Sequence, residues 1–218
     1  KTNKELSFQG PSFNNDLIKK NLVDKIEDEN KYKITFIKND DKLNQHVTKK
    51  LIKEKIVFWF QNGMEFGPRA LGNRSILADP REKNITKIIN LKVKNRELFR
   101  PLAPVVLKKY AKKYFYMFDH ESRYMNIVYK AKDITKKKLP SVVHKDMTSR
   151  VQTIQKNNNI KLYNLIKKFN NFTKTPMLIN TSLNLNEPII MSPHNAFYLF
   201  NQTKVKTLVL NNWVIEKK

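Results

Sequence analysis

The run Ile56–Phe60 is short, apolar and rich in β-branched and aromatic residues, and it leads directly into a segment that holds most of the chain's glycine. Such a run is typical of a buried strand. Glycine occurs only four times in the chain, and three of these residues, Gly63, Gly67 and Gly72, follow the run closely. Because ligands of open α/β sheets bind beyond the carboxyl ends of strands, we expect a binding loop here.

Arginine is also concentrated after this run. Of the 43 lysines and arginines only seven are arginine, and five of these lie in one window: Arg69, Arg74, Arg81, Arg96 and Arg100. A chain that otherwise takes its positive charge from lysine uses arginine where a planar, bidentate donor is needed, which indicates an oxyanion ligand. Backbone amides near Gly67 and Gly72 would add donors. The alternative is an ordinary strand connection in which the arginines pair with Glu65 and Asp79.

The remaining segments predict an α/β architecture. Apolar spacing and capping residues predict a first helix near Asn15 or Asp16, and further helices over 47–55, 82–93, 160–172 and 193–200. Short apolar stretches predict strands at 75–78, 101–107, 124–131, 150–154 and 177–180, and a strand pair over 208–215. Strands and helices alternate, so we expect one domain over 46–218, preceded by an extension over 1–45.

Composition narrows the class of protein. No stretch reaches the roughly 18 apolar residues of a membrane helix, no signal peptide is recognisable and cysteine is absent, so we expect a soluble cytoplasmic protein without thiolate chemistry. The histidines, at positions 46, 120, 144 and 194, lack the spacing of metal ligands, and no metal site is predicted. The net charge of +24 leaves nucleic-acid binding as an alternative. It is the weaker one, because the lysines are scattered along the whole chain.

The residues from Gly63 to Arg81 read GMEFGPRALGNRSILADPR, and this string closely resembles the signature of the C-terminal halves of NodU/CmcH-type O-carbamoyltransferases. The resemblance continues through 93–104, similar to the family's vKxREpFRPfAP, and through 144–153 and 180–184, similar to HvDGTaRvQT and NTSFN. Gly10–Phe13 resembles the GPSYS segment near the junction of the two halves, so the match spans nearly the whole chain. Met147 departs from the pattern, since the family has glycine there, and this bears on the shape of the local loop.

The resemblance implies a YrdC-like domain, as in threonylcarbamoyl-AMP synthase: a twisted mixed sheet flanked by helices, here with a short N-terminal helical extension. In that fold a KxR pair and an SxN pair bind ATP, and the matching residues are Lys94, Arg96, Ser182 and Asn184. Asn180 and Thr181 are predicted to contact ATP as well, and Mg²⁺ would enter with the nucleotide. A lysine and an arginine two residues apart can both reach phosphate oxygens, while serine and asparagine supply directional donors.

The resemblance also implies carbamoyl phosphate as a second substrate. Its predicted ligands are the basic residues Arg69, Arg74, Arg100, His144 and Arg150. The predicted catalytic residues, which would stabilise the charge that develops around phosphorus, are Lys94, Arg96, Arg69 and Arg150.

The implied function is the ATP-dependent activation of carbamoyl phosphate to carbamoyl adenylate. In the family an actin-like N-terminal half then transfers the carbamoyl group to a hydroxyl acceptor, and that half is missing from this chain. Because the chain begins at Lys1 rather than at methionine, we expect a fragment of a carbamoyltransferase, with a homodimer left open. The alternative is a basic YrdC-like module that binds RNA without carbamoyl chemistry.

Overall fold

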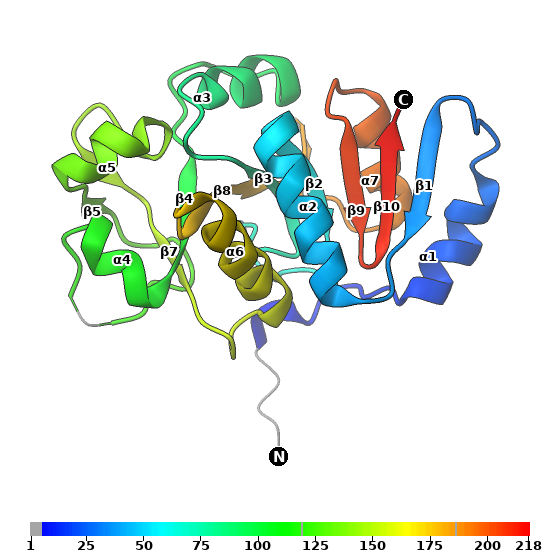
Figure 1. Cartoon of the computed structure of the whole chain (residues 1–218), viewed down its shortest axis with the longest axis horizontal. Coiled ribbons are helices and arrows are strands. Elements are labelled where there is room, and N and C mark those ends of the chain that lie inside the picture. Colours follow the sequence, from blue (N-terminus) through cyan, green and yellow to red (C-terminus); the bar gives the residue numbers. More distant parts are fainter. Residues whose placement is uncertain (1–5, 119, 186) are drawn as a thin grey trace.

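An eight-stranded mixed sheet forms the centre of the molecule (Figure 1). The computed structural model describes residues 6–118, 120–185 and 187–218. The strands of the sheet, in spatial order, are β1 (Tyr32–Phe36), β10 (Trp213–Lys217), β9 (Thr207–Leu210), β2 (Ile56–Phe60), β3 (Arg74–Ala78), β8 (Met177–Ser182), β4 (Ala103–Leu107) and β7 (Gln152–Ile154). A separate antiparallel pair consists of β5 (Tyr129–Lys130) and β6 (Thr148–Ser149).

Helices cover both faces of this sheet (Figure 1). They are α1 (Asn15–Asn21), α2 (Asp40–Glu54), α3 (Ile85–Lys87), α4 (Lys108–Tyr114), α5 (Asp133–Lys138), α6 (Ile160–Thr173) and α7 (Pro193–Asn201). A π-helical segment, Ile88–Val93, continues α3, and 3-10 turns lie at Leu6–Phe8, Val23–Lys25 and Pro140–Val142. None of the helices in the described part of the chain has the length and apolar character that crossing a bilayer requires.

The two long helices begin and end at residues suited to those positions. The Asn39 side chain caps α2 by accepting from the Lys42 amide, and the Asn159 side chain caps α6 by accepting from the Leu162 amide. Both helices end at a lysine in the left-handed region, Lys55 and Lys174, which stops the helical hydrogen-bond pattern. Helices α2 and α6 pack against each other on one face of the sheet.

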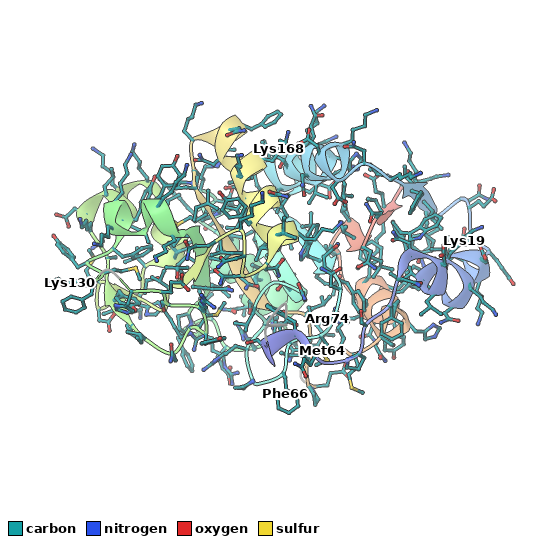
Figure 2. All side chains as sticks on the ribbon, turned by 90° about the horizontal axis from the view of Figure 1, so that it is seen from below. Lys19, Met64, Phe66, Arg74, Lys130 and Lys168 are labelled. Atoms are coloured by element: carbon teal, nitrogen blue, oxygen red, sulfur yellow. The ribbon has the colours of Figure 1, made fainter. Side chains whose placement is uncertain are left out.

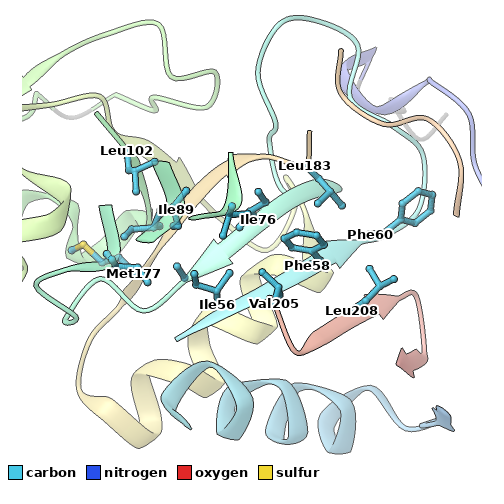
Figure 3. Close-up of a cluster of buried hydrophobic side chains, with 14 of the residues drawn as sticks. Ile56, Phe58, Phe60, Ile76, Ile89, Leu102, Met177, Leu183, Val205 and Leu208 are labelled. Carbon is cyan, nitrogen blue, oxygen red and sulfur yellow. The ribbon is translucent and has the colours of Figure 1, made fainter. Parts of the chain in front are cut away.

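Alternation along the strands divides the core into two layers. In β2, Val57 and Trp59 pack with α2 and α6, whereas Phe58 and Phe60 face the opposite layer, which includes the apolar side of α7. Figure 3 shows this second layer, where Phe58 lies close to Leu208 and Met177 lies close to Ile89. Every residue of β2 is buried on both faces, as the unbroken apolar run predicts.

Strand β8 determines where a ligand can bind. It lies between β3 and β4 and is antiparallel to both, with Ser182 opposite Ser75 and Asn180 opposite Ala103. The C-terminal end of β8 therefore lies beside the N-terminal ends of β3 and β4. Three segments far apart in sequence meet at this end of the sheet: the glycine-arginine loop before β3, the segment before β4, and the residues that follow β8.

The predicted sheet flanked by helices is confirmed, and its boundaries differ in several places. Helix α2 begins at Asp40, earlier than predicted, because Asn39 supplies the cap. The helix predicted over 82–93 ends in π-helical geometry rather than running as one α-helix. The strand predicted over 124–131 is reduced to Tyr129–Lys130.

The extension predicted over 1–45 contributes a strand to the sheet. Strand β1 pairs antiparallel with β10, so that Ile34 lies opposite Ile215. The predicted first helix is α1, capped by Asn14, and its Ile18 is fully buried. The division at residue 45 stays a prediction, although the sheet itself includes residues on both sides of it.

Candidate functional site

Two adjoining pockets lie at the C-terminal end of β8. The inner pocket has a volume of about 70 Å³, and its lining includes Arg69, Arg96, Arg150, Asn180, Thr181 and Ser182. The outer pocket has a volume of about 460 Å³, and its lining includes Lys94, Arg96, Arg100, Ser182 and Asn184. Two carboxylates also line it, Glu187 and Glu97, and Glu97 forms an ion pair with Arg100 at 2.8 Å. Arg96 and Ser182 line both pockets, which therefore adjoin each other. Of the predicted site residues, the structure brings together all except Arg74 and His144.

Lys94 connects the two motifs predicted to bind ATP. Its side chain is only 1% exposed, and Nζ donates to Ser182 Oγ at 3.1 Å and to Asn184 Oδ1 at 2.7 Å. The π-helical turn places it there, since the Lys94 amide donates to the carbonyl of Ile89, five residues earlier. Burial, with the positive charges of Arg96 and Arg100, lowers the pKa of Lys94 to about 7.

Arg96 is held by a residue that sequence reasoning missed, the buried Asn90. Arg96 Nε donates to Asn90 Oδ1 at 2.8 Å, and the Arg96 amide donates to the Asn90 carbonyl at 2.9 Å. Asn90 Nδ2 also donates to the carbonyls of Leu98 and Arg100, which fixes the turn after Lys94. A polar residue between Ile89 and Val93 in the predicted helix is the signal that could have identified it.

The inner pocket carries positive charge without a partner of opposite sign. Within the described residues, no carboxylate forms an ion pair with Arg69, Arg96 or Arg150. Burial and the charge of Arg69 lower the pKa of Arg150, and its Nε is buried without a hydrogen-bond partner in the described part of the chain. Guanidinium groups in this state are suited to bind an anion.

Arg74 was predicted to bind carbamoyl phosphate, and the structure places it elsewhere. Its guanidinium is fully buried, donates to the carbonyls of Gln61 at 2.7 Å and Pro11 at 2.8 Å, and lies 3.5 Å from the centroid of the Phe60 ring. Burial lowers its pKa to about 10. In Figure 2 Arg74 lies inside the molecule near the N-terminal segment, whereas Phe66 points outward. Arg74 therefore joins the Pro11 segment to the sheet.

The loop amides predicted to bind an external oxyanion already bind an internal one. Glu65 Oε1 accepts from the amides of Leu71 at 2.8 Å, Asn73 at 2.6 Å and Arg74 at 3.0 Å, and the side chain is 2% exposed. The amides at the Gly72 end of the loop therefore serve Glu65 and are not free to bind a ligand.

Gly72 is required by this loop for two reasons. Its φ of +114° is rarely adopted by other residues, and a Cβ there would lie 2.3 Å from Leu162 Cδ2 of α6. The close approach of the loop to α6 also lets Asn159 Nδ2 donate to Asn73 Oδ1. The glycine thus allows the loop to lie directly against the helix.

Two side-chain amides fix the other end of the loop. Asn180 Nδ2 donates to the Ala70 carbonyl at 3.0 Å and to Gln152 Oε1 at 2.8 Å, and Gln152 Nε2 donates to the Leu71 carbonyl at 3.0 Å. Asn180 was predicted to contact ATP, and it lies in the inner pocket, beside Arg69 and Arg150. Sequence reasoning missed Gln152, although it belongs to the motif over 144–153, because only the charged residues of that motif were considered.

His144 lies close to the site without lining either pocket. Its Nδ1 is 3.0 Å from Thr148 Oγ1, and burial together with the charge of Arg150 lowers its pKa, against the opposing charge of Asp146. Met147, where the resembling family has glycine, has a φ of +63°, so the loop keeps the backbone geometry that glycine favours.

Within the described residues, no group of three or more histidine, aspartate or glutamate side chains is arranged to hold a metal ion.

Comparison with solved structures shows the class of fold. Full-length HypF, in its phosphate- and nucleotide-bound form, superimposes with a TM-score of 0.57 over 83% of this chain and 22% of its own, at 17% identity. A variant of Sua5 from P. abyssi superimposes with a TM-score of 0.53 over 79% of this chain and 51% of its own, at 12% identity. The fold is that of a YrdC-like domain.

The family follows from the sequence comparison. Residues 48–217 match the family described as Carbamoyltransferase C-terminus, and the chain belongs to that family. Its relatives are longer proteins. An uncharacterized protein of Synechocystis is 36% identical over 97% of this chain and 37% of its own length. Nodulation protein NolNO of Sinorhizobium fredii is 42% identical over 75% of this chain and 24% of its own length, and nodulation protein NolO of Bradyrhizobium diazoefficiens is 39% identical over 75% and 30%.

Proposed function

We propose that this chain activates carbamoyl phosphate with ATP and forms carbamoyl adenylate. The observation that carries the proposal is a pair of adjoining pockets, a small one with unpaired guanidinium groups and a larger one with Lys94 and Arg100, which share Arg96 and Ser182. The small pocket is suited to a compact anion and the larger one to a polyphosphate. Membership of the carbamoyltransferase C-terminal family supports the choice of the carbamoyl group. The phosphate and nucleotide named for HypF support two phosphorylated ligands in this fold.

The proposed reaction has two steps. Water first cleaves carbamoyl phosphate to carbamate and inorganic phosphate. A carbamate oxygen then attacks the α-phosphorus of ATP, the bond from that phosphorus to the pyrophosphate oxygen breaks, and carbamoyl adenylate and pyrophosphate are formed. Negative charge collects on phosphate oxygens in both steps, so fixed cations lower the barrier by electrostatic stabilisation.

The position of each side chain suggests its role. Arg69 and Arg150, confined to the inner pocket, would hold carbamoyl phosphate. Lys94 and Arg100 would hold the triphosphate in the outer pocket, and Ser182 and Asn184 would orient the nucleotide beside Lys94. Arg96, which lines both pockets, would contact the phosphorus that is attacked. When bound with ATP, Mg²⁺ would neutralise part of the phosphate charge.

Transfer of the carbamoyl group to an acceptor is proposed for the part of the protein that lies outside this chain. The chain spans about 37%, 24% and 30% of the length of the three relatives described above. An actin-like N-terminal module would bind the acceptor, and this chain would supply the activated carbamoyl group.

The experiment compares two arginine-to-lysine variants. Pyrophosphate release from ATP is measured with and without carbamoyl phosphate, and carbamoyl adenylate is identified by mass spectrometry. Arg96→Lys keeps the positive charge but loses the two parallel N–H donors of the guanidinium group. We therefore expect the rate of pyrophosphate release to fall by about 10²-fold or more. Arg81→Lys is the matched control, because Arg81 pairs with Asp79 away from both pockets. Release that does not depend on carbamoyl phosphate, or full activity of Arg96→Lys, would refute the proposal.

A further inference from the structure

We infer that Asn180 gives the inner pocket its selectivity for a carbamoyl group, by accepting a hydrogen bond from the substrate's amino group at Oδ1. The inference rests on the proposed function and deepens it. It concerns the one feature of carbamoyl phosphate that guanidinium groups cannot recognise, because the NH₂ group is a hydrogen-bond donor and arginine is a donor only.

The orientation of the Asn180 amide is fixed by a chain of hydrogen bonds. Gln152 Nε2 donates to the Leu71 carbonyl at 3.0 Å, which leaves Gln152 Oε1 to accept from Asn180 Nδ2 at 2.8 Å. Asn180 Nδ2 also donates to the Ala70 carbonyl at 3.0 Å. Reversing the Asn180 amide would place its oxygen against two acceptors. The NH₂ group is therefore fully used, and Oδ1 is the polar atom that remains for a ligand.

The remaining oxygen has no partner in the protein. Asn180 is 1% exposed and lines the inner pocket, and Oδ1 is buried without a hydrogen-bond partner among the described residues. A buried acceptor in this state is unfavourable until a donor reaches it. The surrounding arginines attract an anion, and Oδ1 requires that this anion also carry an N–H or O–H group.

Carbamoyl phosphate meets both requirements. Its phosphate and carbonyl oxygens accept from Arg69 and Arg150, and its amino group donates to Asn180. Acetyl phosphate has nearly the same shape and charge, but a methyl group replaces the amino group, so Oδ1 would stay unpaired. A site built to pair with a substrate N–H discriminates strongly against an analogue that lacks it.

Binding of two stable analogues tests this selectivity without turnover. Phosphonoacetamide carries the amino group, and 2-oxopropylphosphonate carries a methyl group in its place. Isothermal titration of the unmodified chain should give about tenfold tighter binding of the amide, which corresponds to one well-formed hydrogen bond. Asn180→Leu, which keeps the branched shape of the side chain but has no acceptor, should reduce this ratio to about one. Arg150→Lys is the control in the same pocket, and it should weaken both ligands while keeping the ratio.

The ratio of the two affinities distinguishes a loss of recognition from structural damage, because a distorted pocket would weaken the binding of both ligands. Equal affinities in the unmodified chain would overturn the inference even if Asn180→Leu did not fold, and so would an unchanged ratio in that variant. The proposed function is judged separately, by pyrophosphate release with carbamoyl phosphate. Release without selectivity overturns the role of Asn180 alone. Selectivity without release leaves that role supported and overturns the proposed reaction.

Discussion

Lys94 Nζ donates to Oδ1 of Asn184, ninety residues further along the chain, at 2.7 Å. The same amide oxygen accepts from Ser182 Oγ at 2.7 Å, so Lys94, Ser182 and Asn184 form one cluster. Two short motifs that are weak signals when taken separately therefore form a single structural unit. A lysine with lowered pKa inside this unit makes its ligand affinity depend on pH.

The first prediction concerns that pH dependence. Burial and the charges of Arg96 and Arg100 lower the pKa of Lys94 to about 7, and a bound triphosphate would raise it again. Above pH 7, the binding of ATP is then accompanied by protonation of Lys94. The affinity for ATP should be nearly level below about pH 7 and fall by up to tenfold per pH unit above it. Titration calorimetry between about pH 6 and 9 measures this change.

Lys94→Arg is the control for that titration. Arginine stays protonated over the whole range, so the variant reports the ionisation of ATP itself, and only the difference between the two proteins belongs to Lys94. Parallel curves for the two proteins would contradict a lowered pKa.

The second prediction concerns Glu65. Glu65→Gln keeps one acceptor for the amides of Leu71, Asn73 and Arg74, but it removes the negative charge and adds an NH₂ group where Oε2 has no partner among the described residues. We expect the free energy of unfolding to fall by about 1–3 kcal/mol. Urea denaturation followed by tryptophan fluorescence measures it. Glu27→Gln, at an exposed position, should have almost no effect, and equal stabilities of the two variants would contradict the role of Glu65.

The third prediction uses two glycines of the same loop. Gly67 and Gly72 both have positive φ, but a Cβ on Gly67 would meet nothing within 4 Å, whereas one on Gly72 would lie 2.3 Å from Leu162 Cδ2. Gly67→Ala should cost about 1 kcal/mol through backbone strain alone, and Gly72→Ala should cost at least 2 kcal/mol more because the loop must move away from α6. Thermal unfolding of both variants gives the difference, which should disappear when the two glycine changes are compared in a Leu162→Ala background.

The fourth prediction concerns the nucleic-acid alternative. A scattered positive charge should bind duplex RNA only non-specifically, with a dissociation constant of about 10⁻⁴–10⁻⁶ M at physiological salt and a steep dependence on salt. Arg96→Lys should leave this binding unchanged. Tight binding that ATP displaces and that the variant loses would favour an RNA-binding role of the same pocket. Fluorescence anisotropy at several salt concentrations distinguishes the two.

The sequence predicted half of the residues that line the two pockets, among them every arginine and lysine. A buried strand followed by glycine and arginine located the loop, and the resemblance to the carbamoyltransferase family identified Lys94 and Ser182. The direction of a side chain could not be obtained in this way. Arg69 and Arg74 lie in the same loop and are the same residue type, yet Arg74 is the first residue of β3, where pairing with Phe60 places its side chain against that ring.

Contacts made by uncharged residues also could not be predicted from local sequence patterns. The apolar spacing over 82–93 predicted an α-helix, whereas Ile88–Val93 is π-helical and the Lys94 amide donates to the carbonyl of Ile89, five residues earlier. The pairing of β1 with β10 joins the two ends of the described chain, and no periodicity within Tyr32–Phe36 predicts its partner. Gln152 and Asn90 act through hydrogen bonds to backbone or neighbouring side chains, which require the folded chain to be seen.

The carboxylate of Glu65 has a consequence for affinity. A loop that closes around an anion of its own is already ordered before any substrate arrives, so the conformational entropy of arranging it is lost during folding rather than during binding. The proposed substrate, carbamoyl phosphate, has few atoms, and its contacts could not compensate for ordering a whole loop. A protein can thus bind a small metabolite, which makes few contacts, provided that the loop lining the binding site is already rigid.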